Sequence, residues 1–300
     1  MSYIAELTAR LLAGVSLLSG ERRESLKRYF LSALMPDGSF RGRGQTGDLY
    51  YTSFALRGLF LLGGIDNLLL QKITAYIENV KQRQLNAADL TSLLMSESIV
   101  HLLRNTVFTD EDIDCYAVRW AAYRQADGCF ASSVNSAYSS TYATFLAAAS
   151  FELLGRSDLC GAIPLETIMR RQQNGGFTEL PPLRESGTNP TAAAVALFRI
   201  RQESHYDYAA ARTFLQQRQL LSGGFQAHRR IPAADLLSTF SATAALNDIA
   251  VLDSGGNKTD DMNVRHFVNA LRCPDGGYYA YTGDTRSDVE YTFYGMALEN

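Results

Sequence analysis

The sequence lacks a surplus of basic residues, a long apolar run and any convincing strand alternation. Its 28 Lys and Arg are outnumbered by 31 Asp and Glu, and because a nucleic-acid-binding face needs an excess of positive charge, no nucleic-acid partner is expected. One small anionic ligand stays compatible with this balance. No apolar stretch reaches the roughly 18–20 residues that cross a bilayer, so no membrane span is expected either.

Paired cysteine motifs are also missing. The four cysteines are Cys115, Cys129, Cys160 and Cys273. Without a CxxC spacing or a paired framework, they favour reduced thiols and a cytoplasmic location. The N-terminal segment carries Glu6 and Arg10 inside its apolar stretch, which favours an amphipathic helix over a signal peptide.

A glycine turn, a polar loop and an apolar helix instead recur along the chain. The copies span 35–59, 125–146, 173–197, 221–246 and 273–298. They share threonines at a spacing near fifty residues: Thr141, Thr191, Thr239 and Thr292. Such a spacing is typical of a repeat architecture. It predicts one domain over 1–300, with repeats at roughly 21–64, 65–106, 107–155, 156–202, 203–250 and 251–300.

Within each repeat, a charged helix precedes the turn and a helix rich in Ala, Ser, Thr and aromatics follows it. A helix that is apolar most of the way round must be buried. The pattern therefore predicts an all-α protein, an α/α toroid with the apolar helices inside and the charged helices outside. Aspartates at the starts of four apolar helices are predicted N-caps: Asp48, Asp89, Asp235 and Asp288.

The turn sequence DGGF, followed by D-x-x-x-T-x-x-A-L, resembles the β subunits of protein prenyltransferases and, more distantly, squalene and terpene cyclases. The segment DLYYTSFALRGLFLLGG at 48–64 is especially similar, and the resemblance covers roughly 28–298. It implies an isoprenoid diphosphate, or another apolar small molecule, bound in a central aromatic funnel. It leaves open a protein partner or a homodimer. The alternative is a non-catalytic toroid that binds a lipid or a peptide.

The resemblance also implies a zinc ion held by an aspartate, a cysteine two residues later and a histidine in the last repeat. The matching positions are Asp235, Leu237 and Tyr291. Because a zinc site normally takes three ligands from Cys, His, Asp or Glu, no metal ligand is predicted, and the cofactor question stays open. Asp235 is the candidate catalytic residue, with a helix N-cap as the alternative. The resemblance to cyclases implies a run of acidic residues, DxDD, at the start of an inner helix. At the comparable position of this sequence, Asp235 is the one acidic residue.

The resemblance places the diphosphate at basic residues after GGFQ. That loop carries His228, Arg229 and Arg230, and arginine binds phosphate through two parallel hydrogen bonds. The alternative is a solvated loop. Five aromatic residues of the apolar helices are candidates for lining the funnel: Tyr51, Tyr142, Phe240, Tyr291 and Tyr294. Their rings suit an apolar chain or a cation, and ordinary packing between helices is the alternative.

Overall fold

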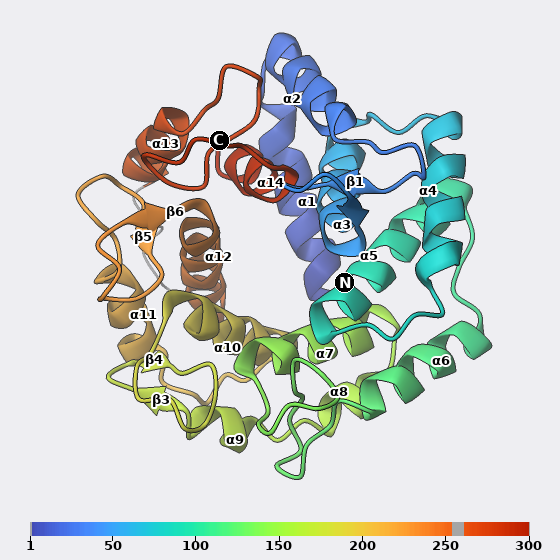
Figure 1. Ribbon diagram of the computed structural model, residues 1–300. Coiled ribbons are helices and arrows are strands. Elements are labelled where there is room, and N and C mark those ends of the chain that lie inside the picture. Colours follow the sequence, from blue (N-terminus) through green and yellow to red (C-terminus); the bar gives the residue numbers. More distant parts are fainter. Residues whose placement is uncertain (1, 254–260, 300) are drawn as a thin grey trace. The chain divides into compact units, whose positions relative to one another are not determined.

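The computed structural model describes residues 2–253 and 261–299, which form fourteen helices and six two-residue strands (Figure 1). The all-α prediction is confirmed. Contacts divide the chain into two compact units, each described below by itself. Unit 1 comprises Met1–Glu6 and Asp114–Phe267, and unit 2 comprises Leu7–Ile113 and Val268–Asn300. The expectation of a single domain over 1–300 stays a prediction.

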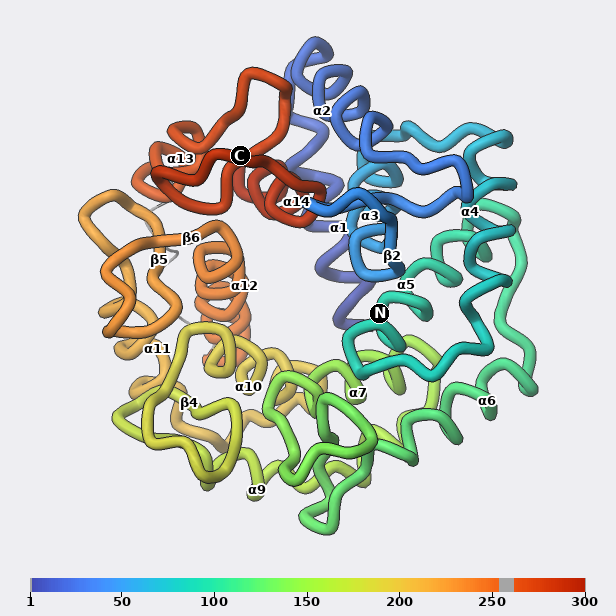
Figure 2. Tube along the Cα trace, viewed as in Figure 1, coloured from blue at the N-terminus to red at the C-terminus, as the bar shows by residue number. Residues whose placement is uncertain are grey.

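Unit 1 is built on three successive apolar helices. The helix α10 (Thr188–Ile200) packs against both α7 (Thr141–Leu153) and α12 (Leu236–Leu252) and lies between them in Figure 2. The short helix α8 (Ser157–Gly161) packs against α7, and α11 (Ala209–Gln216) packs against α10 and α12. Another short helix, α9 (Leu165–Met169), follows α8 in the chain. Two antiparallel strand pairs precede α10 and α12: β3 (Gln172–Gln173) with β4 (Gly176–Phe177), and β5 (Phe225–Gln226) with β6 (Ala234–Asp235).

Unit 2 repeats this arrangement around α3 (Leu49–Leu62), which packs between α5 (Ala87–Arg104) and α14 (Val289–Ala297) (Figure 2). The charged helix α2 (Gly20–Ser32) covers α3, and α4 (Asn67–Val80) covers α5. One strand pair, β1 (Phe40–Arg41) with β2 (Gly47–Asp48), precedes α3. Three further helices have residues in both units: α1 (Tyr3–Ser16), α6 (Asp110–Ala121) and α13 (Asp261–Ala270). No helix in the described ranges has both the length and the apolarity to span a membrane.

A buried threonine ties each turn to the helix that follows it. In the repeat around β5, the Phe225 backbone N–H donates to Thr239 Oγ1 at 3.0 Å, and the Thr239 hydroxyl donates to the Asp235 carbonyl at 2.6 Å. The aromatic–threonine bond recurs in four other repeats: Phe40–Thr52, Phe130–Thr144, Phe177–Thr191 and Tyr278–Thr292. The repeat therefore carries its own hydrogen-bonded link between turn and helix.

This bond corrects the threonine series predicted from spacing, because Thr144 occupies the shared position and Thr141 does not. Thr141 makes a different bond. Its N–H donates to the Glu179 carbonyl at 2.9 Å and its hydroxyl donates to the Thr178 carbonyl at 2.8 Å, both in the next repeat. Thr188 bonds the repeat after it in the same way, with its hydroxyl 2.6 Å from the Gln226 carbonyl.

The glycine of each turn has a positive φ because the turn packs closely on a neighbouring helix. Gly223 has φ +92°, and a Cβ there would lie 2.0 Å from the carbonyl oxygen of Asn263. Gly38 has φ +90°, and its Cβ would lie 2.3 Å from the carbonyl oxygen of Lys72. Only glycine combines this backbone conformation with this approach.

Three of the four predicted N-caps are confirmed. The carboxylates of Asp48, Asp235 and Asp288 each accept the N–H three residues on. The prediction for Asp89 is wrong. Its helix α5 begins earlier, and Asn86 is the N-cap, accepting the Asp89 N–H at 2.8 Å.

Candidate functional site

The basic loop of unit 1 joins β5 to β6. Its three basic side chains lie around the carboxylate of Glu185. Arg230 Nε lies 2.8 Å from Glu185 Oε2, and Arg229 Nε lies 3.5 Å from Glu185 Oε1. His228 Nδ1 is 3.9 Å from the same oxygen. The side chains of Arg229 and Arg230 remain 70% and 72% exposed. The structure thus brings the three predicted residues together and leaves both guanidinium groups accessible to a ligand.

A third guanidinium group, that of Arg218, stands close to this loop. Burial, followed by the positive charge of Arg229, lowers its pKa, while Glu185 acts in the opposite direction. Its buried Nε donates to no partner in the described part of the chain. Three guanidinium groups therefore share the single negative charge of Glu185, so an added anion would be stabilised by the surplus positive charge.

Asp235 is held at the start of α12 by the helix itself. One carboxylate oxygen accepts the Ser238 N–H at 2.7 Å, and the other accepts the Ser238 hydroxyl at 2.8 Å. Burial raises the pKa of this carboxyl, against the hydrogen bonds from Ser238. The N-cap alternative accounts for this geometry, and a catalytic role for Asp235 stays a prediction.

The residues present do not fit the zinc site that the resemblance implies. Leu237 has no ligand atom, and the neutral phenol of Tyr291 is a poor ligand for zinc. Across the described residues, no group of three or more His, Cys, Asp or Glu is placed to hold a metal ion. The described residues therefore offer no ligand set for the zinc chemistry that the resemblance implies.

Three of the predicted aromatic residues share one cluster in unit 2. The rings of Tyr51, Tyr291 and Tyr294 belong to a network of edge contacts between α3 and α14. Its other members are Tyr50, Phe54 and Phe293. Arginines lie over these rings: Arg57 is 4.3 Å from the Phe54 centroid, and Arg43 is 5.4 Å from that of Tyr291.

The two remaining aromatic candidates lie in unit 1. The ring of Tyr142, on α7, is 43% exposed and stands 6.2 Å from that of Phe145. Phe240, on α12, is partly exposed. The five candidates are therefore divided between the two units, and their meeting in a single funnel stays a prediction.

Sequence reasoning assigned no role to Glu290, which lies beside Tyr291 in the first turn of α14. Its side chain is buried, and burial raises its pKa to about 7. The Tyr50 hydroxyl donates to Glu290 Oε1 at 2.8 Å, and this bond together with the charges of Arg57 and Arg43 acts to lower the pKa. The sequence feature that could have identified Glu290 is an acidic residue inside an otherwise apolar helix, beside Tyr291.

Solved structures with the same fold include several enzyme classes. A geranylgeranyl diphosphate complex of Candida albicans protein geranylgeranyltransferase-I is 17% identical, with 92% of this chain and 90% of that chain covered and a TM-score of 0.68. An α-1,6-mannanase variant from Salegentibacter is 12% identical, with 93% and 97% covered and a TM-score of 0.65. A type II terpene cyclase from Scytonema is 13% identical, with 96% of each chain covered and a TM-score of 0.57.

At these identities the likeness shows the fold alone. A comparison with curated proteins gives no significant match. The model of the prenyltransferase alpha-alpha toroid domain matches residues 3–97, 91–230 and 213–300, which together span nearly the whole chain. The predicted fold class is thereby confirmed, and the chain belongs to the prenyltransferase α/α-toroid family.

Proposed function

We propose that the protein binds an isoprenoid diphosphate, with the diphosphate on the loop that carries Arg229 and Arg230. The observation that carries this proposal is the surplus of positive charge around Glu185. A diphosphate would accept paired hydrogen bonds from the two exposed guanidinium groups. It would also reduce the repulsion between Arg229 and Arg218 that contributes to the lowered pKa of Arg218.

The apolar chain of the ligand is proposed to contact the aromatic residues of the apolar helices. Phe240 lies about one turn beyond the start of α12, and the ring of Tyr142 is 43% exposed on α7. Contact with such rings would remove the apolar surface of an isoprenoid chain from water and so stabilise the complex. Two structures with this fold support the ligand class, one in complex with geranylgeranyl diphosphate and one with a geranylgeranyl dihydroxybenzoate substrate.

Calorimetric titration with geranyl, farnesyl and geranylgeranyl diphosphates tests the proposal. The R229A/R230A variant is expected to lose affinity by about tenfold or more, because two charge-assisted contacts are removed. The E185Q variant is expected to bind more tightly, since it removes the competing carboxylate. R23A/R28A is the matched control, with two arginines removed from the exposed face of α2. Unchanged affinity in R229A/R230A would contradict the proposed diphosphate contacts.

A second candidate function, proton transfer to an isoprenoid, is favoured by Glu290. Burial keeps a large fraction of this carboxyl protonated near neutral pH. The Tyr50 hydroxyl and the charges of Arg57 and Arg43 would stabilise the carboxylate left after the proton departs. The proposed chemistry is therefore of the cyclase type and does not need a zinc-activated thiol.

Product analysis separates this candidate from binding without catalysis. Proton transfer from Glu290 followed by loss of a proton from the cyclic cation to water leaves the mass unchanged. Wild-type protein incubated with each isoprenoid diphosphate is therefore expected to form cyclised isomers, detected by gas chromatography and mass spectrometry after a phosphatase has removed the diphosphate. The E290Q variant is expected to bind the same ligand and to form no product. Tight binding without any product in the wild type would leave the alternative, a non-catalytic lipid- or peptide-binding toroid.

A further inference from the structure

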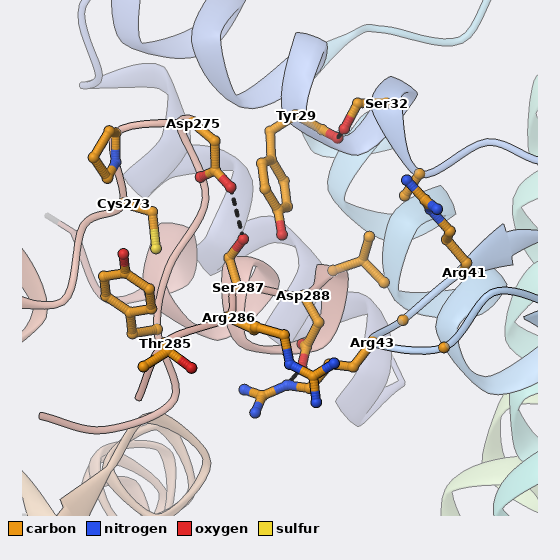
Figure 3. Close-up of a pocket in the computed structure, with 16 residues that line it drawn as sticks. Tyr29, Ser32, Arg41, Arg43, Cys273, Asp275, Thr285, Arg286, Ser287 and Asp288 are labelled. Carbon is orange, nitrogen blue, oxygen red and sulfur yellow. Dashed lines mark hydrogen bonds and ion pairs between the residues drawn. The ribbon is translucent and has the colours of Figure 1, made fainter. Parts of the chain in front are cut away.

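A pocket of about 520 Å³ in unit 2 lies between the loop that follows β1 and the loop that leads into α14 (Figure 3). Its lining and the ion pairs of Arg43 bring together as many carboxylates as guanidinium groups: Asp275, Asp284 and Asp288 with Arg41, Arg43 and Arg286. The charges of this pocket therefore favour no class of ligand. The N-terminal segment of unit 1 makes contacts that are more specific.

The first residues of α1, which belong to unit 1, bond to all three apolar helices of that unit. The Tyr3 N–H donates to Glu152 Oε2 on α7 at 2.7 Å, and the Tyr3 hydroxyl donates to Asp248 Oδ2 on α12 at 2.9 Å. Arg199 Nη2 on α10 lies 2.8 Å from Glu6 Oε2. All three partners lie in the C-terminal half of their helices. The segment therefore ties these helices together at the end opposite the glycine turns that precede them.

The ring of Tyr3 is held between these bonds, and the residue is 6% exposed. The ring stands edge-on to that of Phe145 on α7, with the centroids 6.2 Å apart and the planes at 88°. The centroid of Phe145 lies 6.2 Å from that of Tyr142, in the first turn of α7. A line of three rings thus leads from a residue that is proposed above to contact the isoprenoid chain as far as Tyr3.

The open face of α7 closes at the level of Tyr3. Tyr142 is 43% exposed and Phe145 is partly exposed, but Ala149, about one turn further along, is 1% exposed. Ala149 lies between Phe145 and Glu152, the two residues of α7 that Tyr3 contacts. These four positions share one face, because an α-helix has 3.6 residues per turn.

The open face of α12 ends in the same way. Leu237, Phe240 and Ala244 are partly exposed, and their spacing places them on one face of the helix. Asp248 continues that face, is 2% exposed and accepts the Tyr3 hydroxyl. Between Phe240 and Asp248 the helix rises about 12 Å. A chain that lies along this face therefore meets Tyr3 after roughly that length.

We propose that the ring of Tyr3 ends the surface on which the apolar chain lies, and so limits the length of the isoprenoid that the protein binds. An apolar chain gains affinity with each unit that it removes from water, and this gain stops where the ring blocks further contact. The inference rests on the proposed function, because it takes the chain to lie on Tyr142 and Phe240.

Calorimetric titration with geraniol, farnesol and geranylgeraniol tests this limit. The alcohols carry the chain without the diphosphate, so the result does not depend on the loop at Arg229 and Arg230. Removal of the ring in Y3A is expected to strengthen the binding of geranylgeraniol by about tenfold or more and to leave geraniol unchanged, because only the longer chain reaches the space that the ring occupied. Y3L keeps a smaller apolar side chain and is expected to give the same order with less loss of stability.

Two further variants separate the ring from the bonds around it. Y3F keeps the ring and loses only the hydroxyl that donates to Asp248, while E6Q weakens the ion pair with Arg199 and leaves the ring in place. Both are expected to keep the wild-type ratio of the three affinities. A gain for geranylgeraniol in E6Q as large as in Y3A would assign the effect to a loosened segment and overturn the inference.

An unchanged ratio in both Y3A and Y3L, or an equal change for all three alcohols, would likewise overturn it. Failure of the proposed diphosphate contacts alone has a different signature. In that case R229A/R230A keeps the wild-type affinity for farnesyl diphosphate, while Y3A still alters the ratio of the alcohols. Wild-type protein that binds none of the alcohols or diphosphates would overturn the proposed function and this inference together.

Discussion

The hydroxyl of Tyr50 donates a 2.8 Å hydrogen bond to Glu290, joining the first turn of α3 to the first turn of α14. The two residues are 240 positions apart in the chain. Burial raises the pKa of the Glu290 carboxyl to about 7, because the ionised form loses contact with water and the hydrogen bond offsets only part of that loss.

Glu290 is expected to make folding stability depend on pH. Its pKa is raised from 4.5 when unfolded to about 7 when folded, so the folded state binds its proton more tightly, and the resulting stability is lost as pH rises between these values. The E290Q variant should match the wild type near pH 4 and exceed its free energy of unfolding by on the order of 2–3 kcal/mol at pH 8. Urea denaturation at both pH values checks this, and a pH-independent difference would contradict it.

The threonine at the shared repeat position is expected to contribute strongly to stability. Replacing the buried Thr239 by valine leaves the Phe225 N–H without its acceptor, and the free energy of unfolding should fall by about 1–3 kcal/mol. Thr243 lies on the same helix, and its buried hydroxyl has no partner in the described structure, so T243V is the matched control and should be neutral or stabilising. Chemical denaturation measures both, and equal losses would count against the turn–helix bond.

A methyl group at Gly223 should destabilise the fold more than one at Gly283. Both have positive φ, +92° and +96°, so alanine at either position carries a similar backbone strain of about 1–2 kcal/mol. At Gly223 the added Cβ would also collide with the Asn263 carbonyl, while at Gly283 no atom lies within 4 Å. Thermal unfolding of G223A and G283A should differ clearly. Similar melting temperatures would mean that the turn does not press on α13.

Substitution of Asp235 distinguishes its cap from a catalytic role. Asparagine caps helices about as well as aspartate, so D235N should keep the wild-type stability, whereas D235A should lose about 0.5–2 kcal/mol. If capping is the whole role, D235N also keeps any turnover of isoprenoid substrate. A stable D235N protein that binds ligand and forms no product would instead assign the chemistry to this carboxyl.

Local patterns in the sequence were enough to predict the helical repeats and three of the four aspartate caps, because turns, caps and apolar faces depend on near neighbours. The threonine series failed because Thr141 and Thr144 both fit a spacing near fifty, and only the hydrogen bond to Phe130 distinguishes them. The Asp89 cap failed because Asn86, three residues earlier, competes for the same helix start.

The site was less accessible to prediction. The basic loop could be identified from consecutive residues, but its pairing with Glu185 arises from the preceding repeat. The pKa of Glu290 depends on Tyr50 and on burial between α3 and α14, and neither is visible in a local pattern.

The bonds of Thr141 and Thr188 have a consequence for how such a chain can change in length. Each threonine gives both its amide and its hydroxyl hydrogen to carbonyls of the following repeat. Insertion or loss of part of a repeat would move the acceptor carbonyls away from these amide and hydroxyl donors. Duplication or excision of one entire repeat would instead bring the corresponding carbonyls of another repeat to the same place. Evolution of this scaffold is therefore expected to proceed in steps of about fifty residues.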